Sequence, residues 1–251
     1  MALNQDKHIE KEKRQLRVRK KERTKQTILT EAEKFFSEKP MNEVSLEDIA
    51  EAAFVSRTTL YNYFQNKDEI FFTLGMQAFK KMNEDIKKNF PSDLTGHEQI
   101  LFFCEHGLRA NFERPLNEKI IRESFNRMNH RDASIEEMYY KIAENIGTTK
   151  FKKLFENSKE PYLIELYIEL QKHRDFWMRA VRKGKIDKTI TVDLEDVQIV
   201  EFLYILMLGL NEQVELRKSI LNRIRVDNET IIRNFLPLVT KFLKNESSSL
   251  S

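Results

Sequence analysis

The stretch from Val44 to Ile70 reads VSLEDIAEAAFVSRTTLYNYFQNKDEI. Ser45 stands before an apolar stripe, and its hydroxyl can accept hydrogen bonds from the free N–H groups of a helix start, so we expect a helix over about 46–53. After two further residues Ser56 offers a second N-cap, which predicts a short helix over about 57–64. Helices joined by so tight a turn cross steeply, and the pair forms a helix-turn-helix pattern.

Helical periodicity continues on both sides of this stretch. Apolar residues at steps of three and four predict an amphipathic helix over about 22–38, and Asn66 can cap a helix over about 67–89. Further helices are expected over about 97–113, 116–129, 133–146, 148–157, 161–184, 193–222 and 228–245. The β-branched stretch 188–192 has no second strand to pair with, so we expect a loop there. The predicted fold class is all-α, with an N-terminal helix-turn-helix three-helix domain and a C-terminal helical domain.

The composition is that of a soluble globular protein. The 251 residues are 33% charged and 40% hydrophobic, which argues against a disordered chain. The sequence has no Gly-rich phosphate loop, and a single cysteine, Cys104, excludes an internal disulfide and a multi-cysteine metal site. We expect no metal and no cofactor. The N-terminus lacks a signal-peptide core, and the apolar run 199–210 is too short to span a bilayer, so we expect a cytoplasmic protein without a membrane partner.

Charge is concentrated at the N-terminus. Residues 1–25 hold ten basic and four acidic side chains, a net charge of +6, whereas the whole chain carries +3. A basic segment on a near-neutral body suits a polyanion, either a nucleic acid or an anionic membrane surface.

The quoted stretch closely resembles the DNA-binding region of the TetR/AcrR family of transcriptional regulators, whose pattern runs Ile-Ala-x-x-Ala-Gly-Val-Ser-x-x-Thr-Leu-Tyr-x-Tyr-Phe-x-x-Lys-x-x-Leu. The resemblance covers about residues 24–75 and extends weakly to 180–210, and it does not include residues of about 95–180. It implies a DNA-binding domain (24–75) and a ligand-binding and dimerisation domain (76–245). The charge of the N-terminus predicts a basic arm (1–23), and the serine-rich end predicts a disordered tail (246–251).

One position departs from the family pattern. The family has glycine in the helix-turn-helix turn, and this chain has Phe54. If the backbone there needs a positive φ, phenylalanine costs roughly 1 kcal/mol more than glycine. We therefore expect either a different turn geometry or a Phe54 side chain that offsets the strain by packing.

The short helix 57–64 carries side chains suited to reading DNA. Leu60 and Phe64 are four residues apart and should face the core, while Arg57 can contact guanine or phosphate and Asn62 can pair with adenine. The resemblance implies phosphate and base contacts for Thr59, Tyr61 and Tyr63, and a phosphate contact for Lys67. The complete set of predicted DNA-binding residues is Ser45, Ser56, Arg57, Thr58, Thr59, Tyr61, Asn62, Tyr63 and Lys67.

We expect two features in the C-terminal part, a dimer interface and an effector-binding site. The helix around 199–210 is apolar nearly all round and needs cover on two sides, and the resemblance implies a homodimer through the last two helices. The resemblance also implies a small-molecule effector in this domain. The candidate ligand-binding residues are Phe103, His106, Phe125, Tyr139, Tyr167, His173 and Trp177. Aromatic residues at helical spacing are also typical of an ordinary core, and that interpretation stays open here.

The predicted function is a sequence-specific, DNA-binding transcriptional regulator, a repressor that a small-molecule effector releases from double-stranded operator DNA. The alternatives are a helical protein–protein interaction module with non-specific DNA binding, and a basic arm that binds an anionic surface. We expect no enzyme, because neither HExxH nor CxxC spacing occurs. A Cys-His nucleophile pair stays open at this stage, since such partners meet in space.

Overall fold

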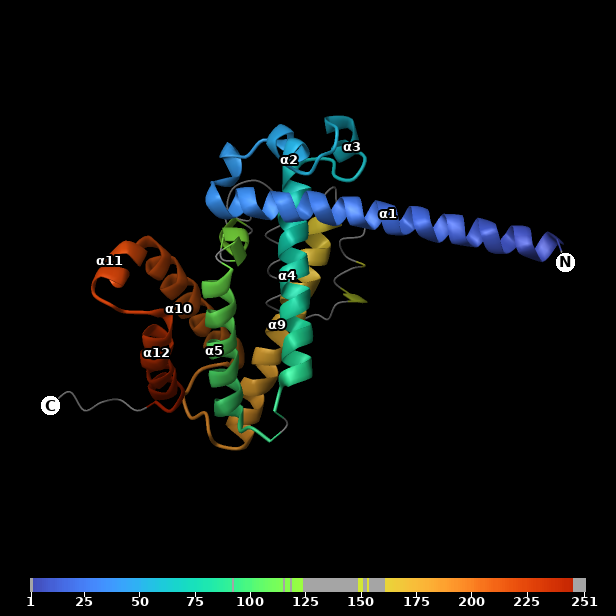
Figure 1. The fold of residues 1–251 in the computed structure, drawn as a ribbon. Helices are drawn as coiled ribbons and strands as arrows, with labels where there is room; N and C mark the ends of the chain where they lie inside the picture. The colour runs from blue at the N-terminus through green and yellow to red at the C-terminus, as the bar shows by residue number, and fades with distance from the viewer. Residues whose placement is uncertain are drawn as a thin grey trace. The chain divides into compact units, whose positions relative to one another are not determined.

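The computed structural model describes residues 2–91, 93–114, 116–117, 119–123, 149–150, 153 and 161–245. Every regular element in these residues is a helix, which confirms the all-α fold class (Figure 1). The chain divides into two compact units, Met1–Leu74 and Gly75–Ser251, and the boundary falls inside a helix. Of the predicted helix 116–129, residues 116–117 and 119–123 are described and are helical. The predicted helix 148–157 lies largely, and the predicted helix 133–146 and tail 246–251 lie wholly, outside the described residues.

The N-terminal unit packs its helices around an apolar core. Ile28, Ile49, Leu60 and Ile70 are fully buried, one from each α-helix of the unit. The rings of Phe36 and Phe71 meet edge to face with centroids 5.1 Å apart. The elements are α1 (Ala2–Glu38), the 3₁₀ helix η1 (Met41–Glu43), α2 (Leu46–Ala52), α3 (Arg57–Tyr61) and the start of α4 (Lys67–Asn89).

Helix α1 is much longer than predicted. It begins at Ala2 rather than near residue 22, so the segment predicted as an arm is helical. The physical reason is that residues 2–22 contain no Gly or Pro and are rich in Lys, Arg, Glu and Gln, all good helix formers. Side chains 10–23 are exposed, so local propensity and not packing supports this half of α1.

The C-terminal unit is a helical bundle in which α5, α9, α10 and α12 share a hydrophobic core. Helix α5 and helix α9 pass so closely that a Cβ on Gly96 would lie 1.9 Å from the backbone nitrogen of Gly184. Around this contact α5, α9, α10 and α12 bury residues such as Phe103, Trp177 and Leu203. The bounds are α5 (Gly96–Glu113), α9 (Pro161–Ile186), α10 (Asp196–Leu216), α11 (Lys218–Arg223) and α12 (Asn228–Leu243).

The predicted helix 193–222 is wrong at both ends. It starts only at Asp196, because the backbone N–H of Glu195 is held by the side chain of Gln198 at 2.9 Å. It is also interrupted at Arg217, whose φ of −103° and ψ of 9° separate α10 from α11. No Gly or Pro marks this break, so the sequence carries no signal for it. The predicted loop 188–192 is confirmed, and it is tied to the end of α12 by hydrogen bonds to the Leu243 carbonyl.

Helix α10 is apolar on two faces. Ile199, Leu203 and Met207 are buried in the core, whereas Phe202 and Ile205 are exposed. With 21 residues, α10 is long and apolar enough to cross a membrane, a test that the core helix of a soluble protein also passes. The run 199–210 is therefore part of a longer helix, and the length of the run alone does not exclude a membrane span.

Candidate nucleic-acid interface

Two serine caps hold the helix-turn-helix in place. Ser45 accepts a hydrogen bond from the backbone N–H of Asp48 at 3.0 Å and caps α2, as predicted. Ser56 does the same for α3, accepting from Thr59 N–H at 3.0 Å. Both serine hydroxyls therefore fix the start of a helix before any ligand is present, and α3 is presented in a defined orientation.

The turn between α2 and α3 contradicts both expectations for Phe54. Its φ is 54°, the left-handed conformation that glycine would adopt without strain. Its side chain is 95% exposed, so packing within this chain does not offset that strain. Phe54 is an exposed aromatic residue on a strained backbone, directly before the cap of α3.

Helix α3 turns its apolar residues inward and its polar residues outward. Leu60 and Phe64 are buried, as predicted, whereas Arg57, Thr58 and Asn62 are exposed. The helix ends at Tyr61 and not at Phe64, because the N–H of Tyr63 bonds to the Leu60 carbonyl and tightens the last turn. Of the remaining predicted residues, Tyr61 is exposed, while Thr59 and Tyr63 are half-buried.

Arg57 is already engaged by its neighbours. Its guanidinium lies 2.7 Å from the carboxylate of Glu47 on α2, and it lies over the Tyr61 ring at 5.7 Å. The pKa of Arg57 is raised, first by its hydrogen bond with Tyr61 and then by the attraction of Glu47. These contacts hold the guanidinium of Arg57, the one cation of α3, beside the helix. The sequence did not predict the ion pair with Glu47, because the spacing of residues within α2 does not tell which side chain of α3 lies next to Glu47.

Lys67 has a contact within the N-terminal unit. Its Nζ donates to the carbonyl of Val44 at 2.7 Å, which ties the start of α4 to the residue before the first cap. Asn66 caps α4 as predicted, accepting from Glu69 N–H at 2.8 Å. The ammonium group has three donors, so two remain for a phosphate. The phosphate contact of Lys67 stays a prediction.

A basic stripe runs along α1 and continues its buried face. Lys11, Arg14, Lys21 and Lys25, here called the basic stripe, follow helical steps that lead to Ile28 and Ala32 in the core. Lys25 Nζ lies 5.5 Å from the ring centroid of Phe64, so this end of the stripe touches the helix-turn-helix.

The residues predicted for effector binding are mostly packed in the C-terminal unit. Phe103, Tyr167 and Trp177 are at most 2% exposed, and Phe103 contacts Trp177 with ring centroids 5.6 Å apart. His106 is half-buried and stacks on Phe102. Phe125 and Tyr139 lie outside the described residues. Ligand contacts for these residues stay a prediction.

His173 belongs to a closed hydrogen-bond network. Trp177 Nε1–H donates to His173 Nε2 at 3.2 Å, so the ring proton is on Nδ1, which donates to Asn83 Oδ1 at 3.1 Å. Asn83 Nδ2 in turn donates to the carbonyl of Glu169 at 2.9 Å. Burial lowers the pKa of His173 to about 3, so the ring is neutral. Both ring nitrogens are occupied, and a ligand that used this ring would have to displace a bond.

Nucleophilic catalysis at Cys104 has no support in this geometry. The thiol is fully buried, and burial raises its pKa far above neutrality, so the reactive thiolate is not formed. No group of three or more His, Cys, Asp or Glu suited to a metal ion occurs in the part of the chain that the structure describes.

Together these features define a class: a capped helix-turn-helix DNA-binding domain, with a basic first helix, joined to a separate helical domain. Residues 28–74 match the family model described as bacterial regulatory proteins, tetR family. Residues 28–74 therefore carry the DNA-binding region of the TetR family of transcriptional regulators, which confirms the resemblance stated above for this part of the chain.

Solved structures share the fold well beyond this domain. A bacterial regulatory protein in the tetR family from Rhodococcus RHA1 aligns at a TM-score of 0.60 and 10% identity, covering 88% of this chain and 96% of that one. The transcriptional regulator FadR from Bacillus subtilis, in complex with stearoyl-CoA, aligns at 0.59 and 13% identity, with 86% and 98% covered. The ketosteroid regulator KstR2 of Mycobacterium tuberculosis aligns at 0.55 and 13%, with 86% and 92% covered. No curated protein matches the chain.

Proposed function

We propose that the protein is a sequence-specific regulator that inserts α3 into the major groove of double-stranded operator DNA. The observation that carries this proposal is the exposed polar side of α3, with Arg57, Thr58 and Asn62 free of the core and a serine cap at each helix start. Arg and Asn are the side chains that pair in two-point fashion with guanine and adenine edges. The function is binding, and no catalytic step is assigned to it.

The basic stripe of α1 supplies affinity in this proposal. It lies on the face of α1 that packs against the helix-turn-helix, so a duplex held by α3 lies within reach of Lys21 and Lys25. Contacts from these side chains to phosphates strengthen binding to any sequence and make it sensitive to salt.

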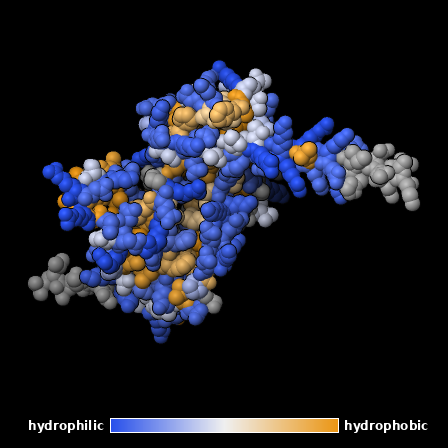
Figure 2. All heavy atoms as spheres, viewed as in Figure 1, coloured by the Kyte–Doolittle hydropathy of each residue, from blue (hydrophilic) through white to orange (hydrophobic). Residues whose placement is uncertain are grey.

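A homodimer through α10 and α12 completes the DNA-binding unit. These helices expose Phe202, Ile205, Leu206 and Leu238 after burying their other faces in the core. Helix α11, which follows α10, also exposes Ile220 and Ile224, and Figure 2 shows hydrophobic atoms scattered among hydrophilic ones around α11. A second copy would cover these exposed residues, and a two-fold pair of α3 helices reads half-sites one helical turn apart, about 34–36 Å.

The dimer has its own experiment. Ile205→Glu places a charge on the exposed face of α10 and should convert the dimer to a monomer in light scattering. Leu16→Glu, an equal change at an exposed position of α1, should leave the oligomeric state intact. A wild-type chain that is monomeric at micromolar concentration contradicts this part of the proposal.

Regulation would act through the helix that both units share. The boundary at Leu74 and Gly75 lies inside α4, whose first residue, Lys67, braces the helix-turn-helix. An effector that prefers a different position of α4 would lower operator affinity, and couplings of about 1–3 kcal/mol are typical. FadR from Bacillus subtilis was solved with stearoyl-CoA, so a ligand-binding relative of this fold exists. We propose repression in the cytoplasm, with release by such an effector.

Selection from a random duplex library tests the DNA-binding proposal. The wild-type chain should enrich an inverted repeat whose half-sites are spaced by one helical turn or a multiple of it. Asn62→Ala should relax the preference at one position in each half-site, with a loss of about 1–3 kcal/mol. A library that stays random while the protein binds it would favour a helical interaction module with non-specific DNA binding instead.

A further inference from the structure

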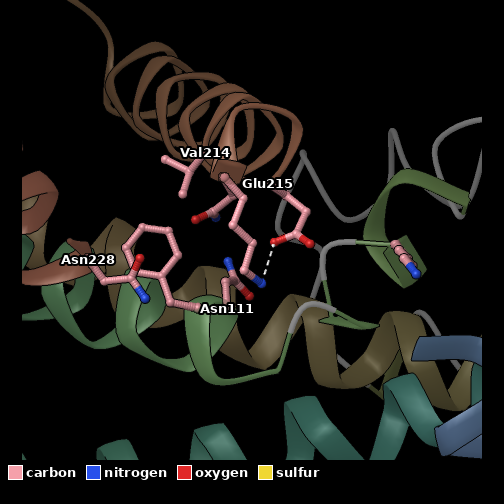
Figure 3. Close-up of a pocket in the computed structure, with 8 residues that line it drawn as sticks. Asn111, Val214, Glu215 and Asn228 are labelled. Carbon is pink, nitrogen blue, oxygen red and sulfur yellow. Dashed lines mark hydrogen bonds and ion pairs between the residues drawn. The ribbon is translucent and has the colours of Figure 1, made fainter. Parts of the chain in front are cut away.

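A small pocket in the C-terminal unit is occupied by paired charges and by an amide that water can reach. It lies where the ends of α5 and α10 meet the starts of α11 and α12, and Figure 3 shows it between Asn111 and Glu215. The Lys218 ammonium lies 3.5 Å from the Glu215 carboxylate. Asn211 is 5% exposed and its amide has no hydrogen-bond partner in the chain, but a cavity of about 60 Å³ holds water. This pocket therefore selects no ligand by its charge, and the feature of the fold that calls for a partner lies in the N-terminal unit.

Phe54, in the turn between α2 and α3, is the most exposed large hydrophobic residue in the described part of the chain. It is 95% exposed, whereas the next, Ile186, is 81% exposed. A single exposed hydrophobic residue is ordinary. Phe54 differs because its backbone is also strained, with a φ of 54°. The other described non-glycine residues with a positive φ have polar side chains: Lys188, Arg225 and Asn245.

Two hydrogen bonds hold Phe54 in this conformation. Its backbone N–H donates to the carbonyl of Glu51 at 3.0 Å, and the N–H of Val55 donates to the carbonyl of Ala50 at 3.0 Å. These bonds close the end of α2 in the Schellman pattern, whose left-handed position is usually glycine. Glycine would fit this position without strain and without an exposed ring. The fold of the N-terminal unit therefore gives no reason for phenylalanine, and residues kept under strain cluster at sites that bind ligands.

Phe54 lies next to the start of α3, the helix that would enter the DNA. It precedes Ser56, the N-cap of α3, by two residues and Arg57 by three. Three residues of chain span at most roughly 11 Å, which is less than the width of the major groove, roughly 12 Å. In helix-turn-helix proteins the N-terminal residues of the second helix contact the base edges. A duplex bound by α3 would therefore pass within reach of the Phe54 ring.

We propose that Phe54 recognises the C5-methyl group of a thymine at the edge of each operator half-site. The ring carries no charge and no hydrogen-bonding group, so it gains little from phosphates or from polar base edges. The thymine methyl is the apolar group that base pairs display in the major groove, and phenylalanine is among the side chains that contact it. The contact would remove apolar surface of both partners from water. This inference rests on the proposed DNA-binding function and adds a base contact to those of Arg57 and Asn62.

Removing the methyl group and the ring, separately and together, tests this contact. In the duplex enriched by selection, each thymine is replaced in turn, in both half-sites, by deoxyuridine, which lacks only the methyl group. At one position the wild-type chain should bind about ten-fold more weakly in fluorescence anisotropy, as expected for two methyl groups that are no longer buried. Phe54→Ala should bind the thymine duplex with a similar loss and lose nothing further with deoxyuridine. Losses that multiply, or the absence of any thymine at which the wild type loses affinity, overturn the proposal.

Further variants separate lost contact from lost folding. Phe54→Gly should unfold at a higher urea concentration than the wild type and still bind the selected duplex about ten-fold more weakly. Ile186→Ala, which removes another highly exposed apolar side chain at the end of α9, should bind like the wild type. A wild-type chain that does not distinguish the selected duplex from a shuffled one contradicts the proposed function, and this inference with it. A wild-type chain that does distinguish them, while both Phe54 variants bind as tightly, contradicts the role of Phe54 alone.

Discussion

The guanidinium of Arg57 on α3 lies 2.7 Å from the carboxylate of Glu47 on α2, and both side chains are more than half exposed. The free protein therefore holds the cation that we propose for DNA contact in an ion pair, which a phosphate or a guanine would have to replace. An exposed pair of this kind contributes about 0.2–1 kcal/mol. Breaking it on binding subtracts a similar amount from the operator affinity.

We therefore expect Glu47→Gln to bind operator DNA about two- to five-fold more tightly at low salt, because the pair no longer competes. Fluorescence anisotropy against a fixed duplex measures this. Glu51→Gln carries the same charge change on α2 without touching Arg57 and serves as the control. Weaker binding by Glu47→Gln would instead mean that Glu47 positions Arg57 for the groove.

The turn residue gives a prediction about stability. Phe54→Gly should raise the free energy of unfolding of the N-terminal unit by roughly 0.5–1 kcal/mol, because glycine adopts a φ of 54° without strain and the exposed ring contributes almost no packing. Phe54→Ala keeps the Cβ on the same backbone and should gain little. Urea unfolding of both variants checks the difference, and equal stabilities would show that the turn is not strained.

Two variants that remove the same number of positive charges from different sides of α1 test which side faces the DNA. Replacing Lys11, Arg14 and Lys21 with Gln should weaken binding to all duplexes and lower the slope of log K against log salt by about 0.9 for each phosphate that is no longer neutralised. The ratio between operator and unrelated DNA should not change, since such contacts do not read sequence.

The matched control for the stripe uses the opposite side of α1. Lys13, Arg19 and Lys20 lie off the stripe and, when replaced with Gln, remove the same charge. Their replacement should reduce the salt slope less. Equal slopes for the two triple variants would place the duplex elsewhere around α1.

The neutral, buried His173 makes stability depend on pH. Its pKa is lowered from 6.5 to about 3 in the folded state, so the unfolded state binds the proton more tightly. The stabilisation is complete above pH 6.5 and is lost as the pH falls below that value. Between pH 7 and 5.5 we expect a loss of about 1 kcal/mol from this group alone.

His173→Gln should remove that part of the pH dependence, although it lowers stability at every pH by breaking the bonds to Trp177 and Asn83. Urea unfolding at pH 7 and 5.5 gives the comparison. His97, whose pKa is also lowered by burial, contributes with the same sign and remains in both proteins. An identical pH dependence in wild type and variant would mean that His173 is not buried neutral.

Local signals predicted the helix starts well. The caps Ser45, Ser56 and Asn66 each place a helix where the structure has one, because the capping hydrogen bond involves residues only three apart. The start of α1 was missed, because residues 2–22 have no amphipathic stripe although they have helix propensity. The break at Arg217 was missed, because no residue type marks it.

Contacts between side chains of different helices could not be predicted from the sequence. The contact of Arg57 with Glu47 depends on how α2 and α3 cross, and that crossing is set by the core and not by either helix. The unpaired Asn211 could not be foreseen either, because an asparagine in an apolar helix shows its missing partners only when its neighbours are in place. Phe54 was identified as a departure, but its full exposure was not expected.

The most direct test of DNA reading by α3 is the affinity of the wild-type chain for the selected duplex and for a shuffled duplex of equal composition, measured by fluorescence anisotropy over a salt series. The account predicts a preference of about 10³-fold or more at physiological salt, reduced by Asn62→Ala. Equal affinity for both duplexes, disappearing together as salt rises, would contradict it and leave only the basic helix α1 in contact with DNA.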